Sequence, residues 1–222
     1  MNDFETWRSD DGRVTLYRAD CLDVLPTLEA GSVDAVVSSP PYNQLGGRIP
    51  AIATGMHRGN GWINGVNGYG YSDDMPEQEY EDWLRDVVRQ CMRVSRELVW
   101  VNHETRYRDG EGIHPTRILP FPLWCEVIWD RGGSMALNCR KFAPSHEYIL
   151  AFGKPNWWND AMNTNMSVWR IAPRRDQEAA GHPCPYPLEI ALRPILASCP
   201  EEGITLDPFM GSGTTGVACV QT

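Results

Sequence analysis

The sequence predicts an α/β fold with parallel strands whose functional groups stand at the strand ends. A β-branched run at 33–37 stops at a serine-proline corner, 38–42, because proline cannot continue a central strand. An amphipathic helix pattern over 80–92 leads to the next strand, 98–101, and such a crossover implies a parallel pair. A strand, a glycine-rich turn and a helix start follow over 203–218. Open α/β sheets bind ligands at strand carboxyl ends, so both turns are candidate sites.

Composition is that of a globular protein with one domain, residues 1–222. The chain is 42% hydrophobic and 22% charged, and it contains no apolar run long enough to cross a membrane. The N-terminus lacks an apolar signal core, so we expect a cytoplasmic protein with no membrane partner. Seven cysteines without a C-x-x-C pair indicate reduced thiols and no metal site.

The net charge of −9 argues against general nucleic-acid binding, but one window differs. Residues 131–175 hold seven basic and two acidic residues. Basic residues interleaved with tryptophans suit a nucleic-acid backbone and stacked bases, whereas a solvated linker is the alternative. The segments 131–145 and 154–181 are therefore candidate DNA-recognition insertions. The candidate contacts are Arg131, Arg140, Lys141, Arg170, Arg174 and Arg175.

The first elements are short. Residues 1–12 are polar and are expected to fray, and residues 14–17 read as a strand that leads to Asp20. A short helix is expected over 21–28, with leucines on one face. Asp20 either caps this helix or holds a ligand, and capping is the simpler interpretation.

A long segment without periodicity, 43–72, follows the serine-proline corner. It contains eight glycines and four asparagines, and loops of this length are functional or disordered. We interpret it as a flexible flap, with a surface loop as the alternative. Asp74 is expected to cap the next helix, with Glu77 completing a capping box.

Strands at 126–129 and 148–152 are expected to pair as an antiparallel hairpin with a basic tip at 131–145. His146-Glu147 opens the second arm, and such an isolated pair is more often structural than catalytic. A helix is expected from Pro187 to about residue 196, although Pro194 should kink it.

Two motifs together are more specific than either alone. Asp207-Pro-Phe-Met-Gly-Ser-Gly-Thr-Thr and the earlier Ser39-Pro-Pro-Tyr resemble DNA amino-methyltransferases of the permuted β class, the N4-cytosine/N6-adenine family. Segments 16–22, 146–150 and 182–188 are also similar to family segments. Tyr186 stands where many members carry a lysine.

The resemblance implies a three-layer, Rossmann-like, S-adenosylmethionine-dependent methyltransferase sheet. This sheet is circularly permuted, seven-stranded and mostly parallel, with one antiparallel strand. The family continues past the glycine helix into a strand that would lie between those ending at Asp207 and Asp20. The chain stops at Thr222, so we expect one strand to be lacking at its C-terminus.

The resemblance also assigns sites. S-adenosylmethionine would be bound by Asp20, Cys21, Leu22, Ser38, His182, Pro183, Pro187, Asp207, Pro208, Phe209, Gly211, Ser212, Gly213, Thr214 and Thr215. The catalytic residues would be Ser39, Pro40, Pro41 and Tyr42. Tyr42 would stack on a base flipped from double-stranded DNA, while the Ser39 hydroxyl and the Pro40 carbonyl accept the amine's hydrogens.

Serine in the first position of S-P-P-Y favours N4 of cytosine, and adenine N6 is the alternative. Glutamine or RNA-base methylation is a weaker option, and cytosine C5 is rejected because the corner has no cysteine. The alternative from another class of function is a non-catalytic DNA-binding relative with an incomplete cofactor site. A homodimer and a cognate restriction endonuclease are the further partners that the resemblance allows.

Overall fold

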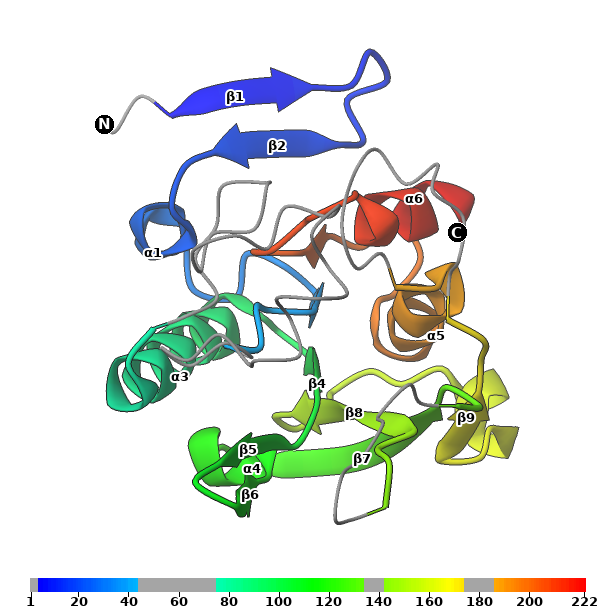
Figure 1. Ribbon diagram of the computed structural model, residues 1–222. Helices are drawn as coiled ribbons and strands as arrows, with labels where there is room; N and C mark the ends of the chain where they lie inside the picture. The colour runs from blue at the N-terminus through cyan, green and yellow to red at the C-terminus, as the bar shows by residue number, and fades with distance from the viewer. Residues whose placement is uncertain (1–3, 44–74, 134–141, 174–185) are drawn as a thin grey trace, which may run out of the picture.

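The structure is a computed structural model that describes residues 4–43, 75–133, 142–173 and 186–222 (Figure 1). Several predictions lie outside these ranges. They are the flap beyond Asn43, the Asp74 cap, most of the basic tip, and the side chains of Arg140, Lys141, Arg174, Arg175, His182 and Pro183.

A central sheet organises the described residues. Its strands are β3 (Ala35–Ser38), β4 (Val99–His103), β7 (Leu123–Asp130), β8 (His146–Phe152), β9 (Val168–Arg170) and β10 (Thr205–Leu206). Their spatial order is β10, β3, β4, β8, β7, β9. β8 runs antiparallel to both neighbours, and the other pairs are parallel. The predicted mostly parallel sheet with one antiparallel strand and the predicted β7–β8 hairpin are confirmed.

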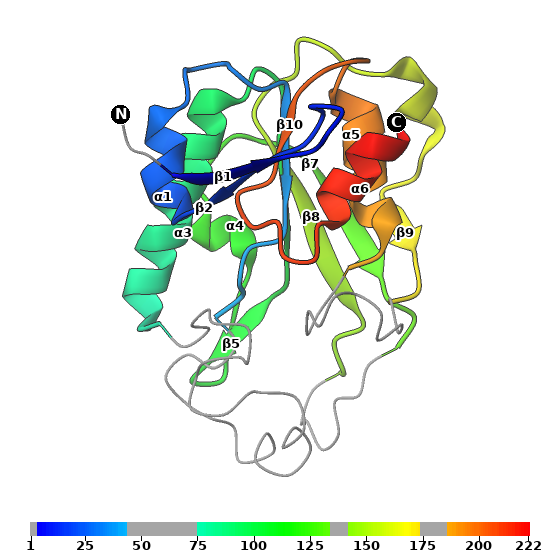
Figure 2. The same cartoon turned by 90° about the horizontal axis from the view of Figure 1, so that it is seen from above.

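Helices cover both faces of this sheet. They are α1 (Cys21–Val24), η1 (Leu25–Thr27), α3 (Glu77–Val94), α4 (Pro115–Ile118), η2 (Asp160–Thr164), α5 (Leu188–Ser198) and α6 (Thr214–Gln221). Figure 2 shows α1, α3 and α4 on one side of the sheet and α5 and α6 on the other. The three-layer prediction is therefore confirmed. Within the described residues, no helix is long and apolar enough to span a membrane.

Alternation along the central strands builds two hydrophobic cores. Val36 packs on the α3 side, and its neighbour Val37 packs on the α5 side. In β4, Val99 and Val101 face α3 while Trp100 faces α5. Because successive strand side chains point to opposite faces, a fully apolar strand is needed between two helical layers.

The N-terminal region differs from the prediction. Instead of fraying, Glu5–Arg8 forms strand β1, which pairs antiparallel with β2, Thr15–Arg18. This hairpin is a separate two-stranded sheet, so the strand before Asp20 is not part of the central sheet as expected. The reason is composition: every β1 side chain is exposed and none in β2 is fully buried. A strand buried between two helical layers needs apolar residues on both faces.

The start of α3 corrects the predicted capping box. The helix begins at Glu77 with Pro76 as its N-cap, so Glu77 is the first helical residue and not the third, as a capping box with Asp74 would require. Glu77 instead forms ion pairs of 2.7 Å with Arg106 and 2.9 Å with Arg108. Both arginines lie in β5 (Arg106–Arg108), which pairs with β6 (Glu111–Ile113). Glu77 therefore ties this small hairpin to the helix.

Helix α5 runs through Pro194 and ends at Ser198. The Ser198 hydroxyl donates to the Pro194 carbonyl at 2.9 Å and accepts from Trp100 Nε1 at 2.8 Å. The helix is thereby joined to β4 in the middle of the core.

Replacing Leu84 by alanine should test the α3 core. Leu84 is 0% exposed, and Leu84→Ala should lower the free energy of unfolding by about 2–5 kcal/mol through lost burial and a cavity. Urea denaturation measures this change. The matched control is Arg89→Ala, which removes an exposed ion pair with Asp86 and should change stability by less than about 0.5 kcal/mol. Equal losses in both variants would contradict the assignment of this core.

Candidate active site

Four chain segments meet at one end of the central strands. The carboxyl ends of β3, β4 and β10 point the same way, because these strands are parallel. β8 is antiparallel, so its amino end lies there too, with His103 of β4 opposite Tyr148. β10 pairs directly with β3, although about 170 residues separate them, as hydrogen bonds between residues 34 and 204 also show. The two sequence motifs are therefore neighbours in space.

Asp207 joins these two motifs through its carboxylate. Oδ1 accepts from the Ser38 hydroxyl at 2.6 Å and from the Phe209 amide at 2.9 Å. Oδ2 accepts from the Thr215 hydroxyl at 2.6 Å. Burial raises the pKa of Asp207, and these three donors act in the opposite direction by stabilising the charged form. Asp207 thus fixes the end of β3 to the glycine loop and to the start of α6.

The glycine loop, residues 207–213, leaves main chain open to a ligand. Gly211 and Gly213 have φ values of 53° and 81°, a region that favours glycine. A Cβ atom on Gly213 would meet nothing within 4 Å. Gly213 is also the N-cap of α6, and no side chain caps that helix. Phe209 packs its ring against Trp83 at a centroid distance of 5.4 Å.

The other predicted cofactor residues have clear local roles. The Asp20 carboxylate accepts from the Leu22 amide at 2.8 Å and caps α1, as the simpler interpretation expected. Burial raises the pKa of the neighbouring Cys21 thiol to about 12. Pro187 is the N-cap of α5. Their contacts to a cofactor stay a prediction.

Tyr186 extends the Asp207 network. Its hydroxyl lies 2.6 Å from the Thr215 hydroxyl, which in turn donates to Asp207. Burial raises the pKa of Tyr186, so it stays a neutral phenol. At the position where the resemblance places a lysine, this chain therefore has a side chain that contacts the first turn of α6 beside Asp207.

The serine-proline corner forms a compact polar cluster. The Tyr42 hydroxyl lies 3.0 Å from Asn102 Oδ1, 3.0 Å from Glu147 Oε2 and 3.2 Å from the Ser39 hydroxyl. Burial, and then the nearby charge of Glu147, raises the pKa of Tyr42 well above its usual value. The Tyr42 ring lies against the His103 ring at 4.7 Å.

Residues of α3 and β5 also contact the backbone of this corner. Tyr80 of α3 donates its hydroxyl proton toward the Pro41 carbonyl at 2.7 Å and lies 2.8 Å from His103 Nε2. Asn43 has a left-handed φ of 54° and donates through its side chain to the Met75 carbonyl. Arg108 also donates to the Asn43 carbonyl. Helix α3 and strand β5 therefore fix the backbone on both sides of Tyr42.

Three residues of this cluster were missed in the sequence, namely Asn102, His103 and Glu147. Asn102 and His103 directly follow the buried strand 98–101, and polar residues at a parallel strand's carboxyl end are a usable signal. Glu147 was interpreted as structural, yet it is buried and contacts the Tyr42 hydroxyl. β8 runs antiparallel to β4, so Glu147 near the start of β8 lies beside the end of β4.

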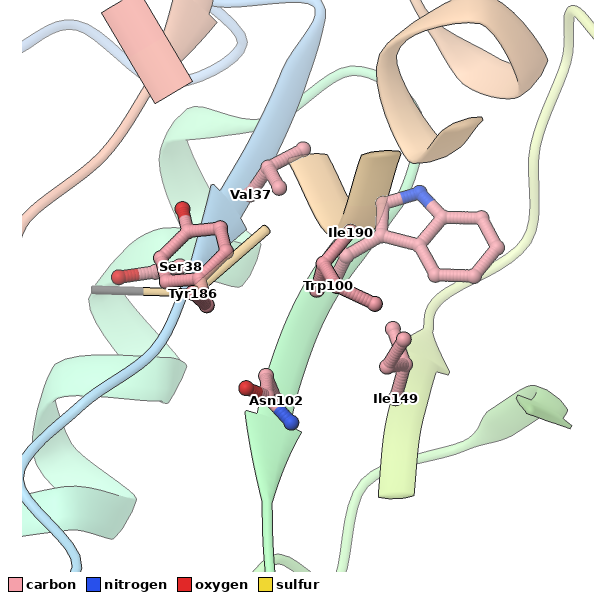
Figure 3. A pocket seen from close by; sticks show the side chains of 7 residues that line it. All are labelled: Val37, Ser38, Trp100, Asn102, Ile149, Tyr186 and Ile190. Atoms are coloured by element: carbon pink, nitrogen blue, oxygen red, sulfur yellow. The ribbon is translucent and has the colours of Figure 1, made fainter. Parts of the chain in front are cut away.

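A small cavity lies between this cluster and α5. Ser38, Asn102 and Tyr186 line it together with apolar side chains such as Val37 and Ile190 (Figure 3). Its volume of about 10 Å³ is close to the space of one water molecule. It separates the Tyr42 cluster from Tyr186 without offering room for a base.

The predicted DNA contacts divide into different environments. Arg131 forms an ion pair of 2.9 Å with Glu147 and is mostly buried. The Arg170 side chain is 86% exposed and lies 3.6 Å from Asp130. The predicted interleaving of aromatic and basic residues is wrong for Trp169, which is buried in the core beneath Arg193.

Comparisons with known proteins agree with this geometry. A family model described as DNA methylase matches residues 33–222. The type II methyltransferase M2.MboI of Moraxella bovis is 24% identical over 232 residues, which cover 96% of this chain and 81% of that protein. The type II methyltransferase M.ScaI of Streptomyces caespitosus is 25% identical over an alignment that covers 92% of this chain and 72% of that protein.

Solved structures share the fold. PvuII DNA methyltransferase (cytosine-N4-specific) superposes with a TM-score of 0.68 at 16% identity, covering 92% of this chain and 77% of that one. A putative DNA modification methylase of Thermus thermophilus, complexed with S-adenosyl-L-methionine, gives 0.53 at 22% identity, with coverages of 90% and 82%. The family model spans most of the chain and includes both motifs joined by Asp207, so this chain belongs to the S-adenosylmethionine-dependent DNA methyltransferases that act on N4 of cytosine or N6 of adenine.

Proposed function

We propose that this chain methylates the exocyclic N4 amine of a cytosine flipped out of double-stranded DNA. One observation carries the proposal: Ser39 and Tyr42 form one polar cluster, and the preceding Ser38 is bonded to Asp207 of the glycine loop. The proposed base site and the proposed cofactor site would therefore be adjacent along the chain, and a hydrogen bond joins their residues. Such adjacency is what direct transfer between two bound molecules requires.

The glycine loop fits S-adenosylmethionine in its donor set and its space. Gly213 has open space where a side chain would stand, and the start of α6 offers backbone N–H groups without a side-chain cap. When bound, the cofactor supplies an electrophilic methyl group on a sulfonium. The residues that would hold it are Asp20, Cys21, Leu22, Ser38, His182, Pro183, Pro187, Asp207, Pro208, Phe209, Gly211, Ser212, Gly213, Thr214 and Thr215.

The chain's own residues position and polarise the amine. The Ser39 hydroxyl and the Pro40 carbonyl would accept its two hydrogens, which localises the nitrogen lone pair toward the methyl group. The Tyr42 ring would stack on the base after flipping. Pro40 and Pro41 hold this turn stiff, and Tyr80 supports the Pro41 carbonyl from behind.

The choice of cytosine rests on Ser39. In the family that the sequence resembles, serine in this position goes with cytosine and aspartate with adenine. The cytosine-N4-specific structural neighbour shares the fold at 16% identity, which is too distant to carry base identity. Arg170 and the segments 131–145 and 154–181 would contact DNA. A homodimer and a cognate endonuclease stay predictions.

The methylated product tests the base. Unmethylated genomic DNA treated with the protein and S-adenosylmethionine, then digested to nucleosides, should yield N4-methylcytosine in mass spectrometry. N6-methyladenine would overturn the choice of cytosine and leave the family assignment intact. No product, together with no measurable S-adenosylmethionine binding in a titration, would favour the non-catalytic relative.

The two adjacent serines should give different defects. Ser39→Ala should lower kcat about tenfold or more with cofactor affinity unchanged, because it removes an acceptor for the amine. Ser38→Ala should lower stability by about 1–3 kcal/mol and weaken cofactor binding, because it removes a hydrogen bond to the partly buried carboxylate of Asp207. Tyr42→Ala should lower kcat through lost stacking. Turnover assays and calorimetric titration measure these effects, and unchanged turnover in Ser39→Ala and Tyr42→Ala would remove the catalytic assignment.

Arg170 should contribute a phosphate contact. Arg170→Ala should weaken DNA binding at all sequences and reduce the salt dependence of the affinity by about one charge. Fluorescence anisotropy at several salt concentrations measures both. Arg89→Ala on α3 removes another paired and exposed arginine and should leave the salt dependence unchanged. If the logarithm of the DNA affinity falls equally steeply with the logarithm of salt concentration in Arg170→Ala and in the protein without substitutions, this contact is excluded.

A further inference from the structure

The hydrogen bonds around Tyr42 have a direction that the structure fixes. Asn102 Nδ2 donates to Glu147 Oε2 at 3.0 Å and to the Tyr148 carbonyl at 3.1 Å. A carboxylate and a carbonyl only accept, so the amide nitrogen must face them. The opposite amide edge, Oδ1, therefore faces Tyr42 and Ser39 as an acceptor.

Tyr42 then has two neighbours that cannot donate to it. Asn102 Oδ1 and Glu147 Oε2 both lie 3.0 Å from its hydroxyl, and both are acceptors. The Ser39 hydroxyl at 3.2 Å is a weaker acceptor than the Glu147 carboxylate, so the single phenolic proton points to Glu147 or Asn102. Its raised pKa keeps that proton on the phenol. The remaining capacity of the Tyr42 oxygen is to accept.

Ser39 comes next along this chain of hydrogen bonds. Its hydroxyl lies 3.2 Å from the Tyr42 oxygen and 3.4 Å from Asn102 Oδ1. Both neighbours accept, so the serine proton is directed inward toward them. The lone pairs of the Ser39 oxygen are then left for a ligand.

We propose that Glu147 and Asn102 are positioning residues that set this hydrogen-bond direction, so that Ser39 presents only an acceptor to the target amine. The inference rests on the proposed function and deepens it by adding residues from β4 and β8 to the catalytic corner. An acceptor-only corner favours a base that carries an amine over one that carries a carbonyl in the same place.

Arg131 fixes the charged end of this arrangement. Its Nη1 donates to Glu147 Oε1 at 2.9 Å, and its Nη2 donates to the Pro144 carbonyl at 3.3 Å. One carboxylate oxygen thus faces a guanidinium and the other faces Tyr42 and Asn102. Arg131 therefore acts on the catalytic corner through Glu147, in addition to any contact with DNA.

Glu147→Gln should reverse the direction of these hydrogen bonds. Arg131 only donates, so it should hold the amide oxygen of Gln and turn the amide NH₂ toward Tyr42 and Asn102. Asn102 Nδ2 cannot donate to this NH₂, so the Asn102 amide should turn over, lose its bond to the Tyr148 carbonyl and present Nδ2 as a donor to Tyr42 and Ser39. The Ser39 proton would then be displaced toward the ligand. We expect kcat to fall about tenfold or more, with the KM for DNA and the affinity for S-adenosylmethionine unchanged.

Tyr42→Phe separates direction from structure. It keeps the ring and the Arg131–Glu147 ion pair but removes the Tyr42 hydroxyl, which is one of the two links between Glu147 and Ser39; the other link is Asn102. Glu147→Gln should therefore cost less in kcat when it is added to Tyr42→Phe than it costs alone. Glu126→Gln on β7, near His114, is the matched control and should leave kcat unchanged.

Turnover of unmethylated genomic DNA by purified full-length variants measures these effects, with thermal unfolding to verify folding. If the protein without substitutions is active and Glu147→Gln has the same kcat, this inference is overturned and the proposed function stands. The same would follow if Glu147→Gln lost as much kcat in the Tyr42→Phe background as alone, because the residue would then act structurally. No methyl transfer by the unchanged protein would overturn both.

Discussion

The partly buried carboxylate of Asp207 is the constraint on which the site depends. A charged group removed from water is costly unless donors satisfy it, and Asp207 receives three from two different parts of the chain. Ser38 belongs to the strand that ends at the catalytic corner, and Thr215 belongs to the helix after the glycine loop. Satisfying one carboxylate thus forces two remote motifs into fixed proximity.

A second set of contacts makes the serine-proline corner rigid. Tyr80 and Asn43 hold the backbone on either side of Tyr42, and Asn102 and Glu147 hold its hydroxyl. His103 lies between the rings of Tyr42 and Tyr80, and burial lowers its pKa to about 4, so it stays neutral in the neutral pH range. Positioning of this kind, without a covalent intermediate, is the contribution that direct methyl transfer needs.

Much of the fold could be predicted because its signals are local. The buried run at 33–37, the amphipathic pattern of α3 and the glycine turn each appear within one stretch of sequence. The predictions failed where a side chain had a distant partner. Glu77 looked like a capping residue but pairs with Arg106 and Arg108, and Trp169 looked like a surface aromatic but fills the core.

The sequence by itself determined the family, the sheet type, the Ser39–Tyr42 corner and the glycine loop, because short motifs and periodicity encode them. Only the tertiary structure decided which side chains surround that corner. Asn102 and Glu147 lie 45 residues apart, and they meet because β8 runs antiparallel and brings its amino end to the carboxyl end of β4. The antiparallel hairpin was predictable, but the residues around Asn102 and Glu147 do not encode the pairing of β8 with β4, so the hydrogen-bond direction at Ser39 is a property of the folded sheet.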